Sequence, residues 1–128
     1  NLEMDTLNAR MSEGLYRTSK ERREDPTLEF LYRSAGPVWY RGMVCTDEKY
    51  DPLTPEQTDA LLRRYDADRL LIGHTIFPDI STFHDGRVIA VNVQNERNRR
   101  KNRGRAVLIE GSRISVVGNR GVKRVLEE

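Results

Sequence analysis

Residues 69–93 constrain the fold more than any other part of this sequence. The stretch begins with the apolar run Leu70–Ile72, which stops abruptly at Gly73. A second β-rich run covers residues 88–93, and a turn sequence at 84–86 precedes it. Apolar runs of this length, bounded by glycine and turn residues, are typical of buried strands. The pattern therefore predicts a strand followed by a hairpin that returns to the same sheet.

The first of these strands ends at a histidine. His74 directly follows Gly73, and an imidazole at a strand end is suited to metal binding or to acid/base chemistry. The alternative is a packed, hydrogen-bonded core histidine, and residues 73–75 alone do not decide between the two. His84, at the hairpin tip, is expected to be exposed and structural.

Composition limits the classes of protein that this chain can represent. The 128 residues suit one domain, with 33% charged residues, 37% hydrophobic residues and a net charge of +2. No apolar run approaches the length of a membrane span, so we expect a soluble protein, either cytoplasmic or periplasmic. The single cysteine, Cys45, excludes an intrachain disulfide and a cysteine-rich zinc site.

The first half of the chain is predicted to be helical and the second half to form a sheet. Helices are expected at residues 2–12, 27–33 and 55–65, and the charged stretch 16–24 is either a loop or a solvated helical turn. Thr54, Pro55 and Gln57 form a strong helix start with a capping box. We thus expect an α/β (α+β) chain that is helical over 1–66, a mixed or antiparallel sheet with hairpins over 69–118, and a fraying tail at 119–128.

A second informative segment covers residues 38–43. It places Trp39, Tyr40 and Arg41 side by side between glycines, which allow the backbone to bend around a ligand. The guanidinium fork of Arg41 suits a phosphate or a carboxylate. A core tryptophan beside a surface arginine explains the same segment, and both interpretations remain open at this point.

Residues 95–105 read NERNRRKNRGR and contain six basic residues. Contact with nucleic acid is one interpretation. The stretch lacks interleaved aromatic residues and lies between two predicted strands, which favours a solvated, mobile loop. A last hairpin is expected from residues 106–110 and 113–117.

Several segments together resemble a known family. These are GPVWYRGM at 36–43, the Thr-Pro-led helix, LLIGHTIFPDISTFHDGRVIAVNV at 70–93 and RAVLIEGSRISVVG at 105–118, with LEMDTLNARM near the start. In order and spacing they resemble the C-terminal half of calcineurin-like metallophosphoesterases, in the bacterial serine/threonine-phosphatase-like branch. The resemblance implies that residues 1–128 are a single partial domain, half of an αββα sandwich. The early motifs of that family, GDxHG, GDxxDRG and GNHE, are absent.

The resemblance also implies a division of roles. His74 would be a metal ligand and Arg41 would hold substrate phosphate, with Tyr40 and Trp39 shaping that wall. No catalytic residue would lie in this chain, and Asn92 stands where many relatives have aspartate. The intact enzyme, a phosphatase-like hydrolase, would use two divalent ions (manganese, iron or zinc) to hydrolyse phosphate esters. It would be active only with its missing N-terminal half, and residues 1–128 alone would hold no metal ion stably.

The implied partners are a phosphoester substrate, the missing N-terminal half of the same protein and a second copy bound through an exposed sheet face or edge. The alternative function is a small binding module that uses the basic stretch on nucleic acid or another polyanion.

Overall fold

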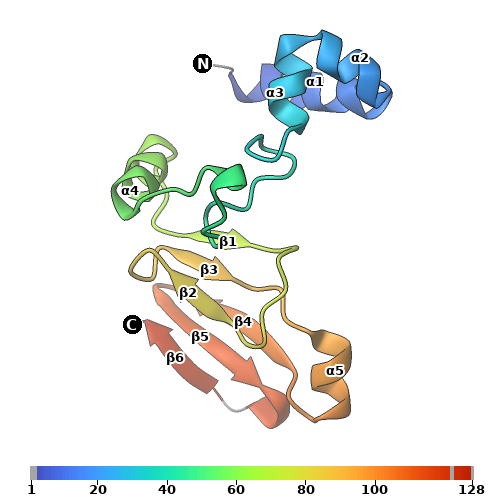
Figure 1. Ribbon diagram of the computed structural model, residues 1–128. Helices are drawn as coiled ribbons and strands as arrows, with labels where there is room; N and C mark the ends of the chain where they lie inside the picture. The colour runs from blue at the N-terminus through green and yellow to red at the C-terminus, as the bar shows by residue number, and fades with distance from the viewer. Residues whose placement is uncertain (1–2, 122, 128) are drawn as a thin grey trace. The chain divides into compact units, whose positions relative to one another are not determined.

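A computed structural model describes residues 3–121 and 123–127 of the chain (Figure 1). These residues form short helices and two small three-stranded sheets, which confirms the expected α+β class. The chain divides into two compact units, residues 1–53 and residues 54–128. No helix in the described part is both long and apolar enough to cross a bilayer.

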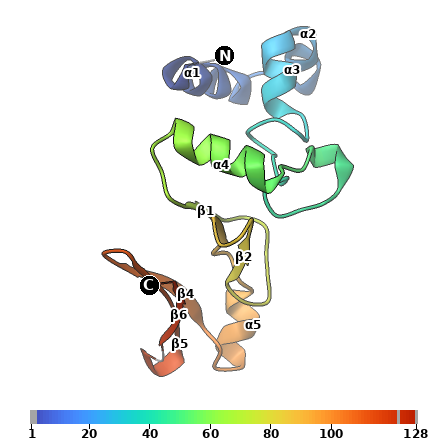
Figure 2. The ribbon, with the colours of Figure 1, turned by 90° about the vertical axis from the view of Figure 1, so that its left-hand side faces the viewer.

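The first unit is built on three helices, α1 (Met4–Leu15), α2 (Ser19–Glu24) and α3 (Pro26–Tyr32), which Figure 2 shows from the side. The charged stretch 16–24 therefore contains a capped helix rather than a loop. Thr18 caps α2 through a capping box with Glu21. Asp25 caps α3 by accepting hydrogen bonds from the backbone N–H groups of Thr27 and Leu28 at 2.9 and 3.1 Å.

Side chains of α3 hold the three helices together. Leu28 and Leu31 are almost completely buried. The Tyr32 ring packs so closely on Gly14 of α1 that an added Cβ would lie 2.2 Å from its Cε2 atom. Arg10 of α1 forms ion pairs with Glu13 and with the capping residue Asp25. Asp25 therefore caps α3 and also links α3 to α1 through its ion pair with Arg10.

The second unit opens with α4 (Pro55–Arg64), which begins as predicted. Thr54 accepts a hydrogen bond from the backbone N–H of Gln57 at 3.2 Å, and the Gln57 side chain accepts one from the Thr54 backbone N–H at 2.8 Å. Asp59 of α4 forms an ion pair with Arg87, the residue before β3. This contact ties the helix to the first sheet.

The first sheet has the strand order β1-β3-β2, formed by β1 (Leu70–Ile72), β2 (Ser81–Phe83) and β3 (Val88–Ala90). β3 pairs with β1 in parallel and with β2 in antiparallel orientation, so the predicted hairpin is present. All three residues of β3 are buried, because this strand has a neighbour on each side.

The second sheet has the order β4-β5-β6, formed by β4 (Arg105–Glu110), β5 (Arg113–Gly118) and β6 (Lys123–Glu127). The predicted hairpin at 106–117 is β4–β5. Its apolar residues and those of the first sheet share one core, made of Ile80, Ile89, Val93, Ile114 and Val116.

Two predictions of secondary structure were wrong. The basic stretch contains a helix, α5 (Asn95–Arg100), where we expected a mobile loop. The tail, expected to fray, provides β6, which pairs with β5 in antiparallel orientation. Polar residues dominate both segments, so neither shows an apolar pattern. β6 forms through its pairing with β5, and α5 contains the ion pair between Arg100 and Glu96, four residues apart.

Candidate functional site

The predicted substrate-binding residues lie in the first unit, in the loop that follows α3. The loop turns at Gly36, where an added Cβ would lie 2.1 Å from the carbonyl oxygen of Phe30. Backbone hydrogen bonds from Val38 N–H to the Leu31 carbonyl at 3.3 Å and from Trp39 N–H to the Gly36 carbonyl at 3.1 Å fix the turn. Only a residue without a side chain fits this approach, so the position of Trp39 relative to α3 depends on Gly36.

Trp39, Tyr40 and Arg41 point to three different surroundings. The Tyr40 hydroxyl donates a 2.8 Å hydrogen bond to the backbone carbonyl of Asp51. Burial, reinforced by the charge of Asp51, raises the pKa of Tyr40, so this hydroxyl stays protonated at neutral pH and remains a donor. The Arg41 guanidinium lies 5.9 Å from the centre of the Tyr50 ring, at cation–π range. Trp39 lines a pocket.

The Trp39 pocket has a volume of about 280 Å³ and lies over α2 and α3. Trp39 is 52% exposed, which is high for a tryptophan that could have joined the core. The remaining walls come from the two helices, and the lining includes Ser19, Arg22, Arg23, Glu29, Tyr32 and Arg33. Three arginines and one carboxylate therefore surround an exposed indole ring.

The three arginines are held differently. Arg22 donates to the Gly14 carbonyl at 3.0 Å and lies 4.6 Å from the centre of the Tyr32 ring, so it is fixed within the wall. Arg23 uses its Nε to bond the Ser19 carbonyl at 3.0 Å. Arg33 stacks over the Phe30 ring at 5.1 Å. The Nη groups of Arg23 and the whole fork of Arg33 form no hydrogen bond or ion pair among the described residues, so they can bind a ligand.

This arrangement can hold an anion attached to an aromatic ring. Arginine forks form charge-assisted hydrogen bonds to phosphate oxygens, and an exposed indole offers a flat face for stacking. Sequence analysis singled out Trp39 but missed Arg22 and Arg23, because it treated residues 16–24 as a solvated charge run. The Thr18–Glu21 capping box was the signal that Arg22 and Arg23 project from a helix. Arg33 was also missed; it is the C-cap residue of α3, and only the packing of α2 and α3 brings it to the same pocket.

His74 lies in the second unit, directly after β1. It is exposed and has a left-handed backbone, with φ of 68°, so it is not the packed core histidine of the alternative interpretation. Among residues 3–121 and 123–127, no group of three or more His, Cys, Asp or Glu side chains could hold a metal ion. The strand-end position of His74 agrees with the sequence analysis, and its role there stays a prediction. His84, expected to be exposed, is half-buried beside the β2–β3 turn.

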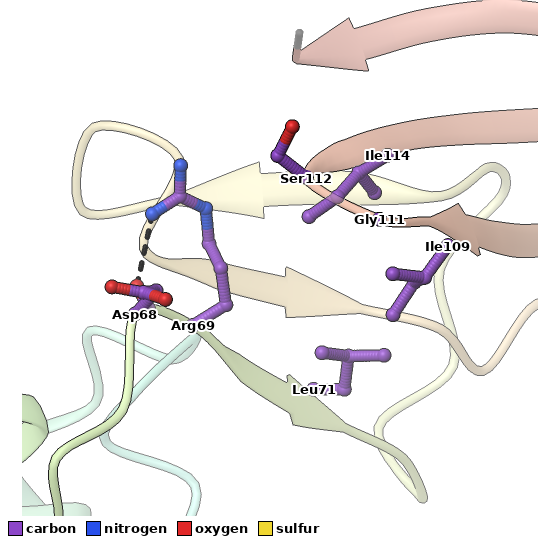
Figure 3. Close-up of a pocket in the computed structure, with 7 residues that line it drawn as sticks. All are labelled: Asp68, Arg69, Leu71, Ile109, Gly111, Ser112 and Ile114. Atoms are coloured by element: carbon purple, nitrogen blue, oxygen red, sulfur yellow. Dashed lines mark hydrogen bonds between the residues drawn. The ribbon is translucent and has the colours of Figure 1, made fainter.

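A second pocket, of about 420 Å³, lies in the second unit between β1 and the β4–β5 hairpin (Figure 3). Leu71, Ile109 and Ile114 form its apolar wall, and the Arg69 guanidinium donates a 2.9 Å hydrogen bond to the Asp68 carbonyl at one rim. None of the candidate site residues predicted from the sequence lines it.

Solved structures with a similar fold exist. A structure titled as a cold-active protein tyrosine phosphatase at 1.1 Å matches 99% of this chain with a TM-score of 0.76 and 24% identity. Another, titled as the cold-active protein tyrosine phosphatase of the psychrophile Shewanella sp., matches 98% with a TM-score of 0.75 and 23% identity. This chain covers only 35% and 36% of those two chains. Because both sequence identities are low, these matches establish similarity of fold alone.

No family model matches the chain, and no curated protein matches it. The chain therefore shares a fold with about a third of each matching structure, and no family membership follows from sequence.

These matches correct the assignment to the calcineurin-like metallophosphoesterases. The matching structures are titled as protein tyrosine phosphatases, so the interpretation as part of a dinuclear-metal phosphoesterase, active only with a missing N-terminal half, is withdrawn. The expected pair of manganese, iron or zinc ions is withdrawn with it, since the described residues gather no ligand cluster. The misleading motifs are short and describe a turn and a strand end, features that unrelated sites can share.

Proposed function

We propose that this chain is part of a phosphatase that acts on phosphotyrosine, and that the Trp39 pocket binds the phenyl phosphate group. The observation that carries the proposal is the meeting of the only tryptophan with three arginines, in a chain whose fold matches structures titled as protein tyrosine phosphatases. The proposal assigns binding, and no step of bond cleavage, to this pocket.

In this proposal, the residues that line the pocket have different roles in binding. Trp39 stacks on the phenyl ring of phosphotyrosine, and the forks of Arg23 and Arg33 bind the phosphate oxygens. Arg22 stays in place against Tyr32 and adds positive charge without moving. Phosphoserine offers the same phosphate without a ring, so the pocket discriminates through the loss of stacking.

The fluorescence of Trp39 provides a direct test, because this is the only tryptophan of the chain. We expect O-phospho-L-tyrosine to quench the emission with saturation, and O-phospho-L-serine to bind several-fold more weakly. Arg33→Ala and Arg23→Ala should each weaken binding roughly fivefold, the range of a partly exposed charge pair. Arg64→Ala, which removes the same charge from the exposed end of α4, is the control and should leave binding unchanged.

Arg41→Ala tests the residue that sequence analysis selected. A loss as large as that of Arg33→Ala would give Arg41 a place in binding, whereas unchanged affinity would exclude Arg41 from the binding of phosphotyrosine. A titration that does not saturate at millimolar phosphotyrosine, or that responds equally to phosphoserine, would contradict the proposed function.

The proposed partners are a phosphoester substrate and a second copy of this chain. Turnover is tested with a phosphotyrosine peptide as substrate. Trp39→Ala should raise KM in that assay more than it lowers kcat, because stacking contributes to ground-state binding.

A further inference from the structure

The basic stretch of the second unit forms a pocket of its own. This α5 pocket has a volume of about 380 Å³ and is lined by four cationic side chains and one carboxylate, together with neutral residues. The cations are Arg97, Lys101, Arg103 and Arg105, and the carboxylate is Asp79. Every residue belongs to residues 54–128, so the pocket lies within one compact unit.

Local structure explains why these cationic side chains line one pocket. Arg97 and Lys101 are four residues apart on α5 and its C-terminal cap, so they share one face of the helix. The backbone N–H of Arg103 donates to the Asn98 carbonyl at 2.7 Å, which folds the chain back beside α5. Arg99 and Arg100 lie on the same helix but do not line the pocket.

The single carboxylate is already neutralised. Asp79 accepts hydrogen bonds from the Arg105 Nε at 3.0 Å and from the backbone N–H of Ile80 at 2.8 Å. By contrast, Arg97, Lys101 and Arg103 form no ion pair with any described residue. The pocket therefore keeps an excess of about three positive charges.

A second observation, independent of the charges, is a buried side-chain amide that lacks a hydrogen-bond acceptor. Asn98 is 8% exposed and lines the pocket, and its Nδ2 group is buried with no hydrogen-bond partner among the described residues. A buried amide donor without an acceptor is destabilising, so such groups are nearly always satisfied. Nδ2 itself has almost no accessible surface, whereas other atoms of Asn98 line the pocket, so rotation of the side-chain amide would bring Nδ2 to a ligand oxygen that supplies the acceptor.

We propose that the α5 pocket binds a diphosphate group. A single phosphate carries a charge of about −1.5 to −2, less than the cationic excess of the pocket, whereas two linked phosphates match it. Their oxygens accept charge-assisted hydrogen bonds from Arg97, Lys101 and Arg103, and one oxygen accepts from Asn98 Nδ2 once the amide has rotated toward the pocket. This site goes beyond the proposed function, since it shares no residue with the Trp39 pocket.

Pyrophosphate is the probe for the first experiment, with binding measured by calorimetry on the whole chain. We expect Arg97→Ala and Lys101→Ala each to weaken binding roughly fivefold. Arg99→Ala is the matched control, because it removes the same charge from the same helix outside the pocket, and its affinity should stay within twofold of the original. An equal loss for Arg99→Ala would overturn the proposal in favour of diffuse attraction to a basic surface.

Two further measurements sharpen the test. The side-chain amide signals of Asn98 in a nitrogen–proton NMR spectrum should shift on addition of pyrophosphate, and unchanged signals would overturn the site. Inorganic phosphate should bind at least fivefold more weakly than pyrophosphate, since it spans fewer of the cations; equal affinity would overturn the diphosphate assignment. Binding of ADP as tight as that of pyrophosphate would support a nucleotide as the source of the group, and binding of pyrophosphate alone would support the free anion.

Discussion

At the scale of single residues, Gly42 marks a close contact within the loop that carries Trp39. An added Cβ there would lie 2.4 Å from the Tyr40 hydroxyl oxygen and 2.8 Å from the Asp51 carbonyl oxygen. Gly42→Ala should therefore displace Tyr40 and weaken its hydrogen bond to Asp51, at a cost of about 1–3 kcal/mol in unfolding free energy. Chemical unfolding followed by Trp39 fluorescence measures this cost.

Gly73→Ala is the comparison for that substitution. No atom lies within 4 Å of the position of its added Cβ, and its backbone is not left-handed. We expect a change below about 0.5 kcal/mol, as for ordinary surface substitutions. A loss at Gly73 equal to that at Gly42 would show that close packing on Tyr40 is not the cause.

The surroundings of single side chains were the feature least predictable from the sequence. The resemblance implied that Trp39, Tyr40 and Arg41 share one wall. The turn places Trp39 at a pocket, Tyr40 against Asp51 and Arg41 near Tyr50, and the binding roles of these residues stay predictions. The arginines that do join Trp39 come from residues 22–33. Proximity of that kind depends on how α2 and α3 pack, which a local pattern does not contain.

At the scale of elements, capping residues were the most predictable feature. The Thr54 start of α4 was predicted correctly, because a cap is a local hydrogen bond between near neighbours. The strand at 70–72 and the two hairpins were also predicted, from apolar runs and Gly-containing turns. α5 and β6 were missed because their sequences are polar and lack an apolar period, and because β6 forms only by pairing with β5.

The capping box of α4 can be tested directly. Thr54→Ala removes the side-chain acceptor of the Gln57 N–H and should lower the unfolding free energy by about 1 kcal/mol. Thr54→Ser retains the hydroxyl and should recover most of that loss. Thermal unfolding followed by circular dichroism compares the two variants, and equal losses would indicate that the threonine methyl group, rather than the cap, is responsible.

Acidic pH should destabilise α3 through protonation of Asp25. The hydrogen bond from Arg10, followed by those from the backbone N–H groups of the cap, lowers the pKa of Asp25. A carboxyl whose pKa is depressed by folding stabilises the fold above its unfolded pKa of about 3.9, and this contribution is lost as the pH falls through the lower, folded value. Stability should therefore decrease between neutral pH and strongly acid pH.

Asp25→Asn keeps an oxygen for the cap but removes the charge that pairs with Arg10. Its thermal midpoint should fall less between pH 6 and pH 2 than that of the original chain. Glu24→Gln is the control, because the ion pair of Glu24 with Lys20, at 3.9 Å, is exposed and weak. An unaltered acid dependence in Asp25→Asn would contradict the role of the Arg10 contact.

At the scale of the whole molecule, the open edge of the second sheet favours self-association. β4 pairs only with β5 among the described strands, so one side of its backbone is available for another strand. Ile109 of β4 is 51% exposed and Leu71 of β1 is 44% exposed, and both line the apolar wall seen in Figure 3. Burial of these side chains in a second copy would remove apolar surface from water.

Ile109→Lys should therefore reduce self-association, because a charge on an edge strand opposes pairing with another chain. The comparison is Ile76→Lys, which changes an equally exposed isoleucine, 58% exposed, that lies outside every strand. Size-exclusion chromatography with light scattering should give a concentration-dependent mass for the original chain and for Ile76→Lys, and a monomer for Ile109→Lys. A monomeric original chain at high concentration would refute pairing through the β4 edge, because the open edge and the exposed isoleucine would then be insufficient to bind a second copy.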